Sequence, residues 1–146
     1  MKSFTIFAVL LLSISTTIGF GYGPKFRAGF MKTQFGFFEK FVHYKDRDAL
    51  NQFISPYFQM ELCDGRRMEG YDFISSVLNM PSSSPFHVEV HNVDYGNPNA
   101  LRDFAYLKFN ITIHGFGKPA FGRGSYIIAD LDNKPTWSNF QEKPCK

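Results

Sequence analysis

The feature that most constrains the fold is a strict alternation of side chains late in the chain. Residues 106–113 carry an apolar side chain at every second position: Leu107, Phe109, Ile111 and Ile113. The residues between them can face water: Tyr106, Lys108, Asn110 and Thr112. This period of two is typical of a strand with one buried face. A glycine-rich turn and a second run, 121–131, follow, so segment 101–131 predicts a pair of long strands.

The start of the chain is predicted to be a secretory signal peptide, residues 1–19. Lys2 supplies a positive charge, Phe4–Leu12 is an apolar run, and Thr17 and Gly19 are small enough for signal peptidase. We expect cleavage after Gly19 or Gly21. The alternative is a membrane anchor, but the run is short for a bilayer and no charged stop signal follows it. We therefore expect a secreted, extracellular protein with no membrane attachment after cleavage.

The remaining chain is long enough for one domain, predicted over 30–146 after a flexible lead-in at 20–29. The 16 Lys and Arg residues are scattered and nearly balanced by 13 Asp and Glu. No basic stripe interleaved with aromatic residues is present, which argues against nucleic acid as a partner. The 18 phenylalanines predict a core filled mostly by aromatic rings.

Cys63 and Cys145 are the two cysteines of the chain. In an oxidising extracellular compartment, an isolated pair is most simply a disulfide. The loop-entropy model gives such a long closed loop about 4 kcal/mol of stabilisation. Two free thiols or an intermolecular bridge are the alternatives.

Helical periodicity predicts three helices. The first begins at Phe30 and carries a broad aromatic stripe: Phe30, Gln34, Phe37, Phe38, Phe41 and Tyr44. The second starts near Asp46 or Asp48, either of which suits an N-cap, and ends at Pro56. The third follows Gly70 and stops at Pro81. A short hairpin is predicted between the second and third helices, and strands over 86–95, 101–131 and 135–145 complete the chain.

This order of elements resembles the NTF2-like family, and in particular the small secreted members found in nematodes. The resemblance is carried by Phe37–Val42, Leu50–Phe58, Cys63–Gly65, Gly70–Ile74 and Ala105–Phe109. It implies an α+β fold, in which a curved antiparallel sheet forms a cone around a long N-terminal helix with two further helices. A cystatin-like inhibitor is the second choice of fold, but its Gln-x-Val-x-Gly loop is absent and it has one helix rather than three.

The fold does not select a function, because the family includes isomerases, dehydratases, transport factors and interaction domains. We expect a non-enzymatic binding module, without a cofactor, whose hollow holds a small apolar ligand. The expected lining is Phe37, Phe41, Tyr44, Phe53, Phe109 and Ile111. The open alternative is that these rings fill the cone. An isomerase- or dehydratase-like enzyme would instead need a polar group inside the cone. A third possibility is a protein partner, or a homodimer, on the sheet face that carries Tyr106, Lys108, Asn110 and Thr112.

Two polar clusters contain residue types that catalytic or metal sites use. His87, Glu89 and His91 alternate on one strand, with His114 on another. His87 and His91 are about 13 Å apart along a strand, so both cannot hold one ion, and a solvated face without metal is predicted. Asp94 and Tyr95 with Tyr44 could form an acid–base group. Tyrosines hydrogen-bonded in the core are the simpler interpretation, so no catalytic residue is predicted.

Asn110-Ile111-Thr112 is an N-glycosylation sequon. The alternation places Asn110 on the polar face of its strand, where a transferase could reach it. A glycan at this position would block dimerisation through the same face. A glycan on Asn110 and a dimer through this face are therefore opposing predictions.

Overall fold

The computed structural model describes residues 24–81, 83–96, 104–130 and 135–145. This part of the chain forms the helices α2 (Pro24–His43), α3 (Arg47–Phe53) and α4 (Gly70–Leu78). Its strands are β1 (Ile54–Glu61), β2 (Arg67–Glu69), β3 (His87–Tyr95), β4 (Phe104–His114), β5 (Ala120–Asp130) and β6 (Thr136–Glu142). The predicted signal peptide lies outside the described residues. Among the described helices, none has the length and apolar character needed to cross a bilayer.

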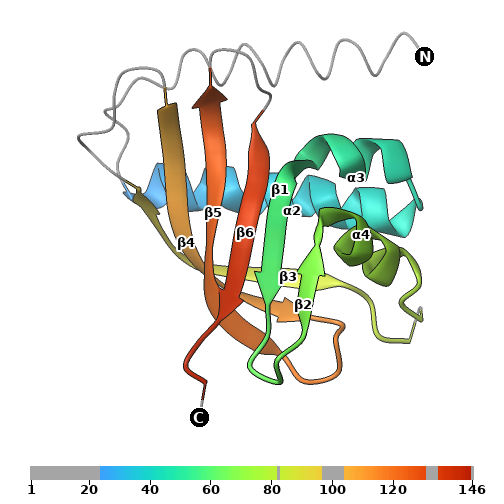
Figure 1. The fold of residues 1–146 in the computed structure, drawn as a ribbon. Coiled ribbons are helices and arrows are strands. Elements are labelled where there is room, and N and C mark those ends of the chain that lie inside the picture. Colours follow the sequence, from blue (N-terminus) through green and yellow to red (C-terminus); the bar gives the residue numbers. More distant parts are fainter. Residues whose placement is uncertain (1–23, 82, 97–103, 131–134, 146) are drawn as a thin grey trace, which may run out of the picture.

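The strands form one six-stranded sheet in the order β2-β1-β6-β5-β4-β3, which curves around α2 (Figure 1). Neighbours from β3 to β6 are antiparallel, as are β1 and β2. β1 and β6, in contrast, run parallel, which the prediction of an antiparallel sheet did not include. Their pairing joins the first and last strands of the domain and places the short hairpin at one edge of the sheet.

The predicted alternation in β4 is confirmed. Leu107, Phe109, Ile111 and Ile113 are all at most 2% exposed, and Lys108 on the opposite face is exposed. Helix α2 lies across the buried face, behind the strands in Figure 1. The ring of Phe35 on this helix meets that of Phe109 edge-on, with 5.4 Å between the ring centroids. The fold is therefore the predicted α+β cone of a curved sheet around a long helix.

Trp137 of β6 is the centre of the aromatic core and is fully buried. Its ring meets rings from α2, β1 and α4 at centroid distances of 5.0 to 5.7 Å: Phe35, Phe38, Phe58 and Phe73. Edge-to-face pairs at such distances add to the stabilisation from burial alone. The expectation of a core filled by aromatic rings is confirmed in the described residues.

Two glycines of β5 let aromatic rings approach its backbone. A Cβ atom on Gly124 would lie 2.5 Å from a ring carbon of Phe109, and one on Gly122 would lie 2.2 Å from the backbone oxygen of Gln141. Either contact is too short for a real side chain, so β5 needs glycine at both positions. The sheet can therefore bend closely around the core at this strand.

The first helix differs from the prediction in its start and in its buried face. α2 begins at Pro24, so residues 24–29 are helical rather than a flexible lead-in. Its buried side chains are Met31, Gln34, Phe35, Phe38 and Val42, whereas Phe30, Phe37 and Phe41 are half-buried. Phenylalanine occurs on several faces of this helix, so periodicity alone could not select the buried one. Pro56, predicted to end the second helix, lies in β1.

Candidate functional site

The six residues predicted to line an apolar hollow lie in different surroundings. Phe53, Phe109 and Ile111 are 7%, 2% and 0% exposed within the packed core. Phe37 and Phe41 are half-buried on another side of α2. Tyr44 follows the end of α2, is 75% exposed and meets the ring of its neighbour His43. The rings that do reach the interior pack against one another.

One polar pair lies inside the cone. The hydroxyl group of Tyr126 donates a hydrogen bond to Oε1 of Gln34 at 3.1 Å, and both side chains are buried. Burial raises the pKa of Tyr126 well above its ordinary value, so the phenol stays protonated. Within the described ranges, no carboxylate or imidazole is buried in this core. The pair supplies a neutral donor and acceptor but no general base.

The histidines form contacts at the β3 edge of the sheet. His87 lies opposite His114, with 5.7 Å between their ring centroids. Oε1 of Glu39 on α2 lies 2.9 Å from Nδ1 of His87 and accepts the backbone N–H of Val88 at 2.8 Å. These contacts fasten α2 to β3. Neither Glu39 nor the pairing of His87 with His114 was predicted, because both depend on tertiary register.

The same histidines do not assemble a metal cluster. His91 lies 2.8 Å from Oγ1 of Thr112, and Nε2 of His114 lies 3.6 Å from Oε1 of Glu89. Over the residues that the structure describes, no group of three or more His, Cys, Asp and Glu side chains is arranged to hold a metal ion.

The proposed acid–base trio of Asp94, Tyr95 and Tyr44 is not brought together. Asp94 lies 3.8 Å from the guanidinium group of Arg27, which in turn lies 4.7 Å from the ring centroid of Tyr95. Arg27 is in the first turns of α2, whereas Tyr44 follows its last residue.

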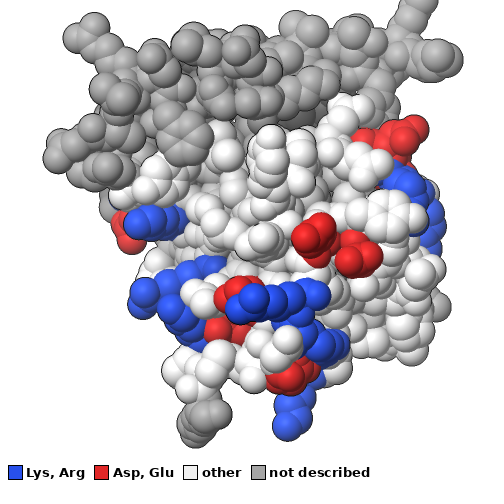
Figure 2. Space-filling view, in the orientation of Figure 1, with Lys and Arg blue, Asp and Glu red and all other residues white. Residues whose placement is uncertain are grey.

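The face of the sheet opposite α2 carries two polar rows that cross all of its strands. Register places the members of the first row side by side: Asp94, Lys108, Ser125, Asn139, Gln59 and Glu69. The second row is formed in the same way: Asn92, Asn110, Arg123, Gln141, Glu61 and Arg67. Figure 2 shows this face, where basic and acidic side chains are interspersed over its lower half. We call these residues the polar rows.

The polar rows enclose a groove of about 550 Å³ over β3 to β6. Its lining is Asn92, Asp94, Tyr106, Lys108, Phe109, Asn110, Arg123, Gly124, Ser125, Asn139 and Gln141. Asn139 donates to Oγ of Ser125 at 2.8 Å. The volume falls in the range of ordinary ligand sites, and most of the lining residues carry polar side chains. We call this hollow the sheet groove.

Charges in the sheet groove are distributed unevenly. Two acidic members of the polar rows form ion pairs near the ends of the rows, Asp94 with Arg27 at 3.8 Å and Glu61 with Arg67 at 3.2 Å, and the third, Glu69, lies on β2 at the far edge of the sheet. Gln141 also donates to Oε2 of Glu61 at 3.0 Å. Arg123, in the middle, forms no ion pair with any carboxylate of the described ranges. The centre of the groove is therefore locally positive.

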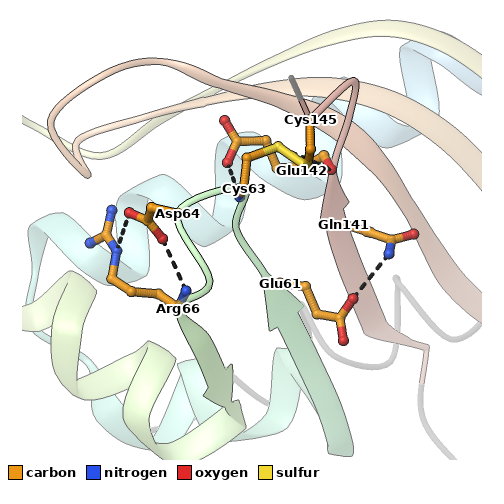
Figure 3. The surroundings of a disulfide bond; sticks show 7 residues. All are labelled: Glu61, Cys63, Asp64, Arg66, Gln141, Glu142 and Cys145. Atoms are coloured by element: carbon orange, nitrogen blue, oxygen red, sulfur yellow. Dashed lines mark hydrogen bonds and ion pairs between the residues drawn. A yellow bond between two sulfur atoms is a disulfide. The ribbon is translucent and has the colours of Figure 1, made fainter.

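The disulfide predicted between Cys63 and Cys145 is present, with Cα atoms 5.1 Å apart (Figure 3). The backbone N–H of Cys63 also donates to Oε2 of Glu142. In the adjoining turn, the backbone N–H of Arg66 donates to Asp64 and lowers the pKa of that carboxyl group. The bridge ties the end of β6 to the β1–β2 hairpin, beside the Glu61–Gln141 end of the second polar row.

The fold and the order of its elements can be compared with known families. A family model described as an NTF2-like domain matches residues 30–127. The chain belongs to the NTF2-like family. This match spans the chain from the interior of α2 to the middle of β5 and agrees with the observed cone. Among curated proteins, no sequence matches this NTF2-like chain.

Solved structures similar to this NTF2-like domain are distant in sequence. One, described as "Rd1NTF2_05 with long sheet", has a TM-score of 0.50 and 10% identity, and the alignment covers 77% of this chain and 95% of that chain. A second, "Rd1NTF2_04 with long sheet", has a TM-score of 0.42 and 11% identity, with 77% and 98% covered. At such identities the first likeness concerns the fold alone, and it leaves the function of this NTF2-like domain to its own residues.

Proposed function

We propose that this NTF2-like domain is a secreted, non-enzymatic binding module whose binding surface is the sheet groove. The observation that carries the proposal is the contrast between the two faces of the sheet. The inner face is packed with rings around Trp137, whereas the outer face holds a groove of about 550 Å³ with exposed polar side chains. A concave surface with several convergent polar groups is the ordinary form of a binding site.

Secretion is supported by two independent features. Residues 1–19 have the charge, apolar run and small residues of a signal peptide. The Cys63–Cys145 bridge is of the kind that persists in oxidising compartments. We therefore expect the ligand of the groove to be an extracellular molecule.

Two other functions receive less support from the described residues. A small apolar ligand inside the cone would have to displace rings such as Phe53 and Phe109, which are already in close contact with neighbours. An isomerase- or dehydratase-like reaction would need a base in the cone, and the polar pair there, Tyr126 and Gln34, is neutral. Binding in the sheet groove requires neither displaced rings nor a base inside the cone.

The test compares a substitution in the groove with a matched one elsewhere. Ser125→Trp would fill the groove, and Asn51→Trp would place the same ring on the exposed side of α3. Native mass spectrometry would follow the binding of three probes: a hyaluronan tetrasaccharide, a hexaglutamate peptide and a long-chain fatty acid. We expect the wild type and Asn51→Trp to retain a polar probe and Ser125→Trp to lose it. Retention of the fatty acid by all three proteins would place binding inside the cone and contradict the proposal.

A further inference from the structure

The middle of the sheet groove carries two cations on neighbouring strands. Arg123 lies opposite Asn110 of β4 and Gln141 of β6. Lys108 is the diagonal neighbour of Arg123 on the same face, which corresponds to a separation of about 7–8 Å at the backbone. The ammonium group of Lys108 lies 5.8 Å from the ring centroid of Tyr106, within reach of the groove. Both side chains are exposed.

The acids of the same face do not neutralise Arg123. Asp94 contacts Arg27, and Glu61 contacts both Arg67 and Gln141. A guanidinium group offers a planar fork of donors that matches a carboxylate or a sulfate. The centre of the groove thus complements an anionic group, while Asp94 at its β3 end already forms an ion pair with Arg27.

Amide side chains surround these cations. Asn92 and Asn110 lie side by side in one row, and Asn139 and Gln141 border the groove from β6. Each amide has both a donor and an acceptor end, which suits a hydroxyl group that also donates and accepts. A ligand that matches the whole groove is therefore rich in hydroxyl groups and carries at least one anion.

An acidic peptide fits this position less well than a sugar does. The groove spans β3 to β6, of which β3 is an edge strand, whereas its centre lies over β4 and β5, which each have a hydrogen-bonded strand on both sides. The backbone N–H and C=O groups of these strands are already paired, so a peptide cannot add to the sheet there as it can at an edge. Its recognition would rest on side chains alone, whereas hydroxyl groups of a sugar can meet the amide row directly.

We propose that the sheet groove binds an acidic oligosaccharide, with Arg123 and Lys108 on its carboxylate or sulfate and the amides of both polar rows on its hydroxyl groups. This inference rests on the proposed function and names its ligand class. Binding of this kind is weakened by salt, because the two cations are exposed to solvent. It also requires that Asn110 carry no glycan.

The test is calorimetry on the full chain produced in the bacterial periplasm, where the disulfide forms and Asn110 stays unmodified. The probes are a hyaluronan tetrasaccharide, a sulfated heparin tetrasaccharide, neutral cellotetraose and the hexaglutamate peptide. We expect one acidic tetrasaccharide to bind and the neutral one not to. Arg123→Gln should weaken that binding at least about tenfold, since a charge-assisted contact is lost. Lys118→Gln, which removes a charge from the exposed turn after β4, should change it less than about twofold.

Several outcomes would overturn the inference. Equal weakening by Lys118→Gln would mean non-specific attraction to a basic protein. Equal affinity for cellotetraose would remove the role of the cations, and tighter binding of hexaglutamate would assign the groove to an acidic peptide while leaving the proposed function intact. Absence of binding by all four probes would overturn both the ligand class and the groove as the binding surface.

Discussion

The ring of Phe109 occupies the space in which residue 124 would carry its Cβ atom. A Cβ on Gly124 would lie 2.5 Å from a carbon of that ring. β4 and β5 are paired at these two residues, so the contact fixes how closely the sheet can bend around the core. The same two residues also border the sheet groove from beneath.

Gly124→Ala is expected to destabilise the protein by roughly 1–3 kcal/mol, because the added methyl group would overlap both the Phe109 ring and the backbone oxygen of Asn139. Urea denaturation followed by tryptophan fluorescence measures the change, since Trp137 is buried in the same core. Gly29→Ala is the matched control, because nothing lies within 4 Å of a Cβ there and α2 already has helical backbone. Equal destabilisation by both substitutions would contradict the close approach.

Tyr126→Phe should cost about 1–3 kcal/mol, since Gln34 would remain buried without its donor. Replacing both partners in Tyr126→Phe/Gln34→Leu should recover part of that loss. A double-mutant cycle measured by urea denaturation gives the coupling energy. Additive losses would mean that the two side chains do not interact in solution.

Stability should also fall in alkali because of Tyr126. Its pKa is raised in the folded state above the ordinary value of 10.0, so the unfolded state releases the proton first. The contribution of Tyr126 to the free energy of unfolding is therefore fully present below pH 10.0. It decreases as the pH rises beyond that value. Denaturation midpoints at pH 8 to 11 should therefore decline more steeply for the wild type than for Tyr126→Phe. Parallel curves would contradict the burial of the phenol.

Loss of the disulfide by Cys63→Ser/Cys145→Ser should lower stability by roughly 4 kcal/mol in the loop-entropy model. The cysteines are 82 residues apart in sequence, so the bridge restricts a large part of the unfolded chain. Thermal denaturation of the variant and of the oxidised wild type measures the loss. The wild type treated with reductant should match the variant, and a difference between them would point to a direct effect of the serines.

The sequence predicted what depends on local periodicity and on the cysteine count. The alternation around Phe109 determines the two faces of β4 by itself, because successive side chains of a strand point to opposite sides. The buried face of α2 differs from the predicted stripe: Phe35, outside the stripe, is buried, and Tyr44, within it, follows the helix and is exposed. Several faces of that helix carry phenylalanine, and only the position of Trp137 decides between them.

The sheet groove could not be predicted, because it depends on register between distant strands. Arg123 meets Gln141 and Asn110 only after β5 has paired on both sides. The parallel pairing of β1 with β6, which extends both polar rows to the hairpin, leaves no pattern in the sequence. Polar residues at alternate positions indicated a solvated face but not its concave shape.

A glycan at Asn110 and a ligand in the sheet groove should exclude each other, because Asn110 is part of the lining. Protein secreted from eukaryotic cells can be separated on a lectin column into glycosylated and unmodified fractions. The unmodified fraction is expected to bind the acidic tetrasaccharide, and the glycosylated fraction to bind it at least about tenfold more weakly. Equal binding by the two fractions would place the ligand away from Asn110.

The central claim is that ligands meet the outer face of the sheet while the inner face remains packed. Backbone amide chemical shifts of the labelled protein, recorded during titration with the acidic tetrasaccharide, test it most directly. The account predicts shifts that gather at Lys108, Arg123 and Asn139, with Phe38 and Trp137 unchanged. The account would be contradicted by shift changes centred on Phe38 and Trp137. It would also be contradicted if the amide shifts of the groove residues stayed constant during the titration.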